Sequence, residues 1–169
     1  MRARRILAAT LLAACAALLG AATAQAAGPS HAKAKRYAHR TYINQLGHRR
    51  HFVLQGGRHA VTASDGSRIT AWNILLADSG DGSGEAVIVF RGRRFLGWAS
   101  ISTSIHVAVH ARGRAIDVVY GAYSGNDPFC CPHATRTIAY RWNGSRIVAS
   151  ATPPREYGRR GAQLHLAAG

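Results

Sequence analysis

The feature that most constrains the fold of this chain is a regular succession of short apolar stretches between residues 68 and 150. Ile69–Ala77 is apolar almost throughout and is bounded by glycine-containing breakers, which predicts a buried strand. Glu85–Arg91 is rich in β-branched and aromatic residues, and Ala115–Tyr120 alternates apolar with polar residues. Asn143-Gly144 lies between two further stretches of this kind and is a strong hairpin signal. We therefore expect a mainly β fold, a single antiparallel meander sheet of about six strands, with a small irregular or helical N-terminal part.

The first 26 residues have the pattern of a signal peptide. Three arginines precede the uncharged apolar run Ile6–Ala22, and Ala24-Gln25-Ala26 offers small residues for cleavage after Ala26. A second interpretation stays open, because Leu12-Ala13-Ala14-Cys15 fits a lipobox in which Cys15 would be lipidated. The protein is then either secreted, in the extracellular space or the cell wall, or lipid-anchored to the outer face of the cytoplasmic membrane. We expect no transmembrane span after signal removal.

The remaining residues are enough for one domain with a core. We expect residues 27–50 to form a basic flexible tether, residues 51–152 the β-meander domain and residues 153–169 a mobile basic tail. Between Tyr42 and Leu54 the apolar residues come in short pairs, which fit either an irregular hairpin or one short helix.

The exported part is strongly basic, with 19 Lys and Arg against 7 Asp and Glu. Such a balance favours contact with polyanions, such as anionic envelope polymers or lipid head groups. The composition also fits a coding bias towards Ala, Arg and Gly, so part of the charge has no functional meaning. Five histidines, His31, His39, His48, His51 and His59, are scattered through the basic N-terminal segment and would strengthen polyanion binding in acid if that segment is more than a solvated tether. No specific recognition of nucleic acid is expected.

The loop Gly121–His133 carries the unusual chemistry of the chain. Cys130 and Cys131 are adjacent and should oxidise outside the cell, which predicts a vicinal disulfide that locks the loop. A redox-active pair and an intermolecular disulfide are alternatives, and His133 beside the two thiols resembles a weak soft-metal cluster. The candidate binding residues of this loop are Asn126, Asp127, Phe129 and His133.

Two other clusters are weaker candidates. Asp78, Asp81 and Glu85 lie among glycines and have carboxylates that bind Ca²⁺, but their spacing is not that of an EF-hand and also fits a solvated hairpin loop.

The second cluster is on a predicted hairpin. His106 and His110 would lie diagonal to Asp117 if Ala108 pairs with Asp117, as an acid–base pair, a metal site or simply a polar outer face. Trp72, Trp98 and Trp142 fall on three predicted strands and are expected to pack against the sheet.

Three fragments together resemble the LppP/LprE lipoprotein family of actinobacterial envelope proteins. They are EAVIVFRGRRFLGWAS (Glu85–Ser100), VVYGAYSGNDP (Val118–Pro128) and TIAYRWNGSRIVAS (Thr137–Ser150), and the resemblance extends over about Ile69–Ser150. It implies an exported, often lipid-anchored protein of unknown function, and it supplies no catalytic residues.

The sequence favours an exported, non-enzymatic envelope protein without a cofactor, which binds anionic polymers through its basic surface. Two alternatives remain. One is a redox-active or metal-binding protein centred on Cys130-Cys131, and the other is a domain that binds an unknown protein partner and uses the cysteines as a structural staple.

Overall fold

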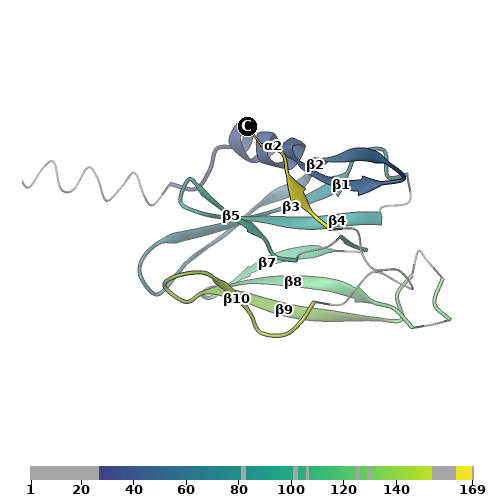
Figure 1. Ribbon diagram of the computed structural model, residues 1–169. Coiled ribbons are helices and arrows are strands. Elements are labelled where there is room, and N and C mark those ends of the chain that lie inside the picture. Colours follow the sequence, from purple (N-terminus) through teal and green to yellow (C-terminus); the bar gives the residue numbers. More distant parts are fainter. Residues whose placement is uncertain are drawn as a thin grey trace, which may run out of the picture.

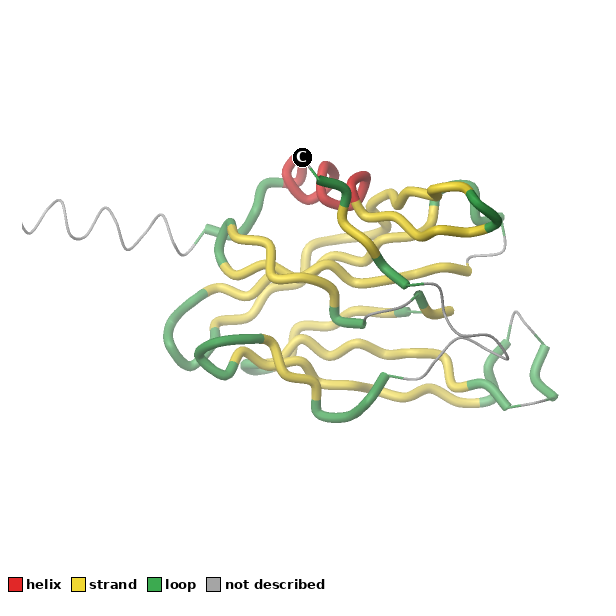
Figure 2. Tube along the Cα trace, viewed as in Figure 1, coloured by secondary structure: helices red, strands yellow, loops and turns green. Residues whose placement is uncertain are grey.

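The computed structural model shows two antiparallel β-sheets packed face to face, with one helix on the outer side of the larger sheet (Figures 1 and 2). It describes residues 27–80, 83–100, 103–105, 107–124, 126–128, 131–153 and 163–168. The predicted signal peptide and Cys15 lie outside these residues.

The larger sheet has the strand order β11-β1-β2-β3-β4-β5, and β6 pairs with β4 beside this path. Its strands are β1 (Thr41–Gln45), β2 (His48–Thr62), β3 (Arg68–Leu76), β4 (Ser83–Arg91), β5 (Arg94–Trp98), β6 (Ser104–Ile105) and β11 (His165–Leu166). The smaller sheet has the order β10-β9-β8-β7. It consists of β7 (Ala108–Arg112), β8 (Ala115–Ala122), β9 (Ala134–Trp142) and β10 (Ile147–Ala149).

The prediction of a mainly β, antiparallel chain with a sheet of about six strands is confirmed by the larger sheet. The finding that the sequence pattern did not predict is the division into two sheets. Strands β7 to β10 were expected to continue the meander, but they form a sheet of their own that lies across the first (Figure 1). Alternation along a strand indicates which face of the strand is buried. It does not indicate whether that face packs against a helix or against a second sheet.

The core between the sheets explains why the central strands are so apolar. One face of β3 and β4 contributes Ile69, Ala71, Val87 and Val89 to this core, which also contains the aromatic residues Tyr120, Tyr140 and Trp142 of the smaller sheet. The opposite face of the same two strands packs into a second cluster under the helix. Strands buried on both faces have nearly continuous apolar sequences, which agrees with the pattern of Ile69–Ala77.

The helix α2 (His31–Arg40) corrects the prediction of a flexible tether over residues 27–50. Ser30 caps its first turn by accepting a hydrogen bond of 3.2 Å from the Lys33 amide. Ala34 and Ala38, one turn apart, are fully buried against the larger sheet. The prediction was wrong because the helix buries mainly alanines, and a face of small residues gives little signal in a basic segment.

The next segment is a hairpin, which resolves the alternative left open for residues 42–54. Strands β1 and β2 pair through Gln45 and His48, and Leu46 and Gly47 in the turn both have positive φ angles. The breaker at Gln55-Gly56-Gly57 does not end β2, since the register shifts between Gln55 and Arg58 as a β-bulge.

The C-terminal residues also correct a prediction. The tail was expected to be mobile from residue 153, yet β11 pairs with β1, and Leu164 is buried in the core under the helix. Arg40 donates two hydrogen bonds to the Ala167 carbonyl, from Nε at 3.2 Å and from a terminal guanidinium nitrogen at 2.7 Å. Residues 154–162 lie outside the described part of the chain.

Candidate functional site

The loop between β8 and β9 is organised around the carboxylate of Asp127. This side chain accepts hydrogen bonds from the Ser124 amide at 2.7 Å and the Ser124 hydroxyl at 2.9 Å. It also accepts from the His133 amide at 3.1 Å, and its Oδ2 lies 2.7 Å from Nδ1 of the same residue. The backbone bond from Ser124, followed by the bonds from His133 and the Ser124 hydroxyl, lowers the pKa of Asp127 well below its usual range. A single carboxylate thus joins the two ends of the loop.

The residue types of this cluster are those of a hydrolytic triad, but their order is different. In a triad the imidazole lies between the hydroxyl and the carboxylate and takes the hydroxyl proton. Here the Ser124 hydroxyl donates to Asp127, and His133 contacts the other oxygen of the same carboxylate. This arrangement orders the loop and gives Ser124 no general base.

The other predicted residues of the loop lie near this hub or outside the described residues. Asn126 is exposed, and the Cys131 amide donates a 2.9 Å hydrogen bond to the Pro128 carbonyl, which closes a turn. Phe129 and Cys130 lie outside the described residues, so the Cys130–Cys131 disulfide stays a prediction.

The acidic candidates near β4 do not converge. Asp78 has a positive φ of 64° in the exposed turn after β3. Glu85 is buried, and its carboxylate accepts a hydrogen bond from the Val107 amide. Asp81 lies outside the described residues, and within those residues no group of three His, Cys, Asp or Glu side chains is placed to hold a metal ion. Glu85 therefore links β4 to the segment before β7.

The register of the β7–β8 hairpin differs from the expected one by two residues. His110 pairs with Asp117, and Ala108 pairs with Val119. The histidine is thus directly opposite the carboxylate and not diagonal to it, while His106 lies outside the described residues. Asp117 is buried, and one of its carboxylate oxygens forms an ion pair of 2.5 Å with the exposed Arg112.

A histidine of the larger sheet also approaches this hairpin. The His59 ring on β2 lies 6.5 Å from the His110 ring, measured between centroids. Burial, and then the charge of His110, lower the pKa of His59. Both effects disfavour the charged form of His59, so this histidine is less suited than a solvated one to strengthen polyanion binding in acid.

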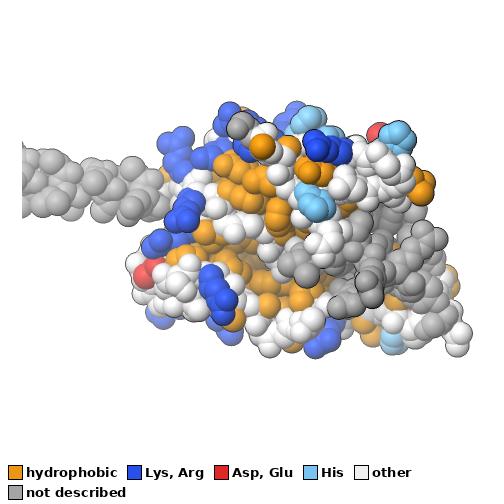
Figure 3. Space-filling view, viewed as in Figure 1, with side chains coloured by type: hydrophobic (Ala, Val, Ile, Leu, Met, Phe, Trp, Pro, Cys, Tyr) orange, Lys and Arg blue, Asp and Glu red, His pale blue; other side chains and the backbone are white. Residues whose placement is uncertain are grey.

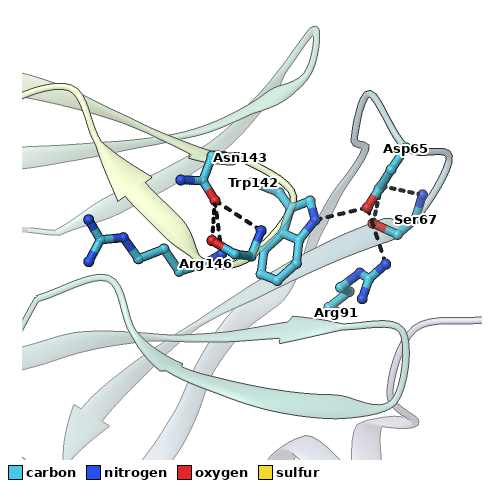
Figure 4. Close-up of polar contacts among 7 residues, drawn as sticks. Asp65, Ser67, Arg91, Trp142, Asn143 and Arg146 are labelled. Atoms are coloured by element: carbon cyan, nitrogen blue, oxygen red, sulfur yellow. Dashed lines mark hydrogen bonds and ion pairs between the residues drawn. The ribbon is translucent and has the colours of Figure 1, made fainter.

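The polar cluster that the sequence did not predict joins the two sheets at one end (Figure 4). Asp65, in the turn between β2 and β3, accepts a 2.8 Å hydrogen bond from the indole nitrogen of Trp142 at the end of β9. Arg91, at the end of β4, forms a 3.1 Å ion pair with the same carboxylate, and its guanidinium carbon lies 4.8 Å from the centre of the Trp142 ring. We call Asp65, Arg91 and Trp142 the inter-sheet clamp.

Hydrogen bonds within the β2–β3 turn hold the Asp65 carboxylate of the clamp in place. Ser67 donates to the Asp65 carboxylate from its hydroxyl at 2.5 Å and from its amide at 2.9 Å. The hydroxyl bond and then the amide bond of Ser67, helped by Trp142 and Arg91, lower the pKa of Asp65 to about 2. Asp-Gly-Ser at residues 65–67 is a turn signal in the sequence, but nothing local to it indicates a tryptophan partner 77 positions away.

The tryptophans follow the expectation of sheet packing. Trp72 and Trp142 are buried in different cores, and Trp98 packs against the core under the helix. They lie on β3, β9 and β5, and they do not form a shared aromatic platform.

The geometry defines a mainly β domain of two packed sheets, in which the described polar clusters organise turns, loops and the contact between sheets. Residues 65–145 of this domain match the model of the LppP/LprE lipoprotein family. The match confirms the resemblance seen in the sequence fragments, and it begins and ends at the clamp, from Asp65 to just beyond Trp142. Comparison with curated proteins gave no match, and neither did comparison with solved structures.

A match to a lipoprotein family indicates an exported, envelope-associated protein. In the part of the chain that the structure describes, no helix has the length and apolar character needed to cross a membrane.

Proposed function

We propose that the protein is an exported, non-enzymatic envelope protein that binds phosphate-rich anionic components of the cell envelope through its basic surface. The observation that supports this proposal most is that few carboxylates are available to neutralise the basic surface. The described residues include sixteen Lys and Arg and five Asp and Glu. Four of the five acids, all except Asp78, are engaged within the fold.

The engaged acids do not neutralise most of the surface arginines. Asp65 and Asp117 pair with one arginine each, Glu85 faces a backbone amide, and Asp127 holds the loop. Figure 3 shows Lys and Arg side chains around the edge of one face, with little acidic surface between them. Because guanidinium groups match the geometry of phosphate oxygens, such a surface favours phosphate-bearing polyanions over isolated small anions.

The experiment is retention of the purified exported protein on immobilised inorganic polyphosphate, with the uncharged resin as control. We expect retention at low salt and steep loss between low and moderate salt, because exposed charges are screened within about 8 Å at physiological ionic strength. Failure to bind at low salt, or retention that does not change with salt, would contradict the proposal.

The cysteine pair has a structural role in this account. Asp127 already joins the ends of the loop, and a Cys130–Cys131 disulfide would fix the turn between them. Replacing both cysteines with serine should then lower thermal stability without changing retention on polyphosphate. If the double variant is as stable as the native protein, and titration of the native protein finds two reactive thiols, the staple is ruled out in favour of the redox alternative.

A further inference from the structure

Four turns from both sheets lie together at one end of the molecule. They are residues 63–67 between β2 and β3, 92–93 between β4 and β5, 113–114 between β7 and β8, and 143–146 between β9 and β10. In an antiparallel sheet alternate turns fall at the same end, so each sheet contributes two. The inter-sheet clamp connects the ends of the two sheets, because Asp65 contacts Trp142 across them.

Arginines are concentrated at this end. Eight lie in these turns or within two residues of them, and we call this group the arginine end: Arg68, Arg91, Arg93, Arg94, Arg112, Arg114, Arg141 and Arg146. Six of the eight are exposed, and Arg68 and Arg91 are partly buried. Figure 4 shows two of them, Arg91 and Arg146, on either side of Trp142.

Few carboxylates oppose this charge. Asp65 and Asp117 are the described acids near the arginine end, and each pairs with one of its arginines, Arg91 and Arg112. The other six arginines make no ion pair with a described carboxylate. The opposite end holds the remaining described acids, Asp78, Glu85 and Asp127, together with the arginines at 49, 50 and 136, so the net positive charge is larger at the arginine end.

The start of the described chain lies at the same end. Gly28 packs against Thr70, the third residue of β3 counted from the arginine end, so closely that a Cβ on Gly28 would stand 2.7 Å from the Thr70 hydroxyl. Figure 1 shows this first segment, in purple, beside the ends of the strands. The residues before it are those with the sequence pattern of an export signal or a lipid anchor. The chain therefore joins its membrane-directed segment at the arginine end.

We propose that the arginine end docks on the anionic phosphate head groups of a lipid bilayer, with the strands pointing away from the membrane. This inference rests on the proposed binding of phosphate-bearing components and assigns it a surface and a partner. The six unpaired arginines come from four turns of two sheets, so they are spread over the end surface. The head groups of a bilayer form a planar array of phosphates, which can contact several of these arginines at once.

The test compares two triple variants of the full exported chain for binding to vesicles. Arg93, Arg114 and Arg146, each exposed and unpaired, are changed to glutamine in one variant. The matched control changes three exposed arginines away from this end, Arg36, Arg58 and Arg136, to glutamine, so both lose the same charge. The vesicles contain phosphatidylcholine with phosphatidylglycerol, or phosphatidylcholine alone, and soluble polyphosphate serves as a competitor.

We expect the arginine-end variant to bind the anionic vesicles on the order of 100-fold more weakly than the native chain, at roughly fivefold for each lost cation, and the control to lose less than about fivefold. Hydrogen exchange of the turns at 92–93 and 143–146 should slow on the vesicles, while the turn at Leu46-Gly47 should not change. Circular dichroism of both variants confirms that they fold.

Equal weakening of both variants would overturn the arginine end as the docking surface and leave the proposed function intact. Polyphosphate that binds the native chain more tightly than the vesicles do would overturn the bilayer as the partner. If the native chain binds neither vesicles nor polyphosphate, the proposed function and this inference both fall.

Discussion

At the scale of single residues, the core between the sheets contains a pair of buried tyrosines. The hydroxyls of Tyr120 and Tyr140 lie 2.9 Å apart between the sheets. Burial raises the pKa of Tyr140 to about 12, and burial with the neighbouring phenol raises the pKa of Tyr120 still further. Each hydroxyl therefore provides the other with a hydrogen-bond partner inside the core.

The tyrosine pair predicts a non-additive mutant cycle. Tyr120→Phe leaves the Tyr140 hydroxyl buried without this partner and should cost about 1–3 kcal/mol of unfolding free energy. The double change to phenylalanine removes both groups and should cost less than either single change alone. Urea unfolding of the three variants measures this, and additive losses would show that the two hydroxyls do not depend on each other.

The same pair predicts sensitivity to alkali. Both folded pKa values lie above that of an unfolded tyrosine, near 10, so the unfolded chain loses protons first. Stability should be intact below pH 10 and fall as the pH rises towards 12, by up to about 1.4 kcal/mol per pH unit for each tyrosine. The double phenylalanine variant should lose this slope, and an unchanged slope would assign it to other groups.

Asp127 predicts a local effect in the loop. Asp127→Asn keeps the size of the side chain but cannot accept four hydrogen bonds, so the amides of Ser124 and His133 should exchange at least about tenfold faster with solvent. The control is Asn126→Ala, at an exposed neighbour, which should leave both amides unchanged. Equal rates in the two variants would show that the carboxylate does not hold the loop.

At the scale of elements, the segments outside the central strands complete the fold. Helix α2 covers one face of the larger sheet, and β11 pairs with β1 to form an edge of that sheet. Trp72, Ile74 and Leu76 lie on the face of β3 that points away from the core between the sheets. They are buried because the helix and its neighbours cover that face.

The C-terminal contact is tested with Leu164, which is 7% exposed in the core under the helix. Leu164→Ala should lower the unfolding free energy by about 2 kcal/mol, because a buried leucine loses both its transfer energy and its packing. Gln163→Ala, an exposed neighbour, is the matched control and should stay within about 0.5 kcal/mol of the native value. A loss as small as that of the control would mean that the tail contributes little in solution.

Some of these elements could be predicted from the sequence and others could not. The central strands and the Asn143-Gly144 hairpin were predictable, because strand alternation and turn residues are local properties. A small helical N-terminal part was expected, but its position at residues 31–40 was missed, as was β11. Both elements depend on packing with strands that are distant in the sequence. In the site, Asp127 and His133 were singled out as candidate binding residues, but their mutual contact was not predicted. The clamp was missed because Asp65 and Trp142 meet only after the sheets pack.

At the scale of the whole molecule, charge is distributed unevenly over the two-sheet scaffold. The carboxylates mostly serve the interior, the loop and the clamp, and the unpaired arginines gather at the end where the described chain begins. This arrangement separates stability from binding. Removing exposed arginines should therefore change binding and salt dependence far more than it changes unfolding.

The dependence of polyphosphate affinity on salt tests this account most directly. For the native chain, a plot of the logarithm of the binding constant against the logarithm of salt concentration should have a steep negative slope. Changing Arg93, Arg114 and Arg146 to glutamine should reduce the magnitude of that slope by roughly one for each arginine. A flat plot for the native chain would contradict polyanion binding, and a steep plot with the same slope in the variant would place the binding surface elsewhere.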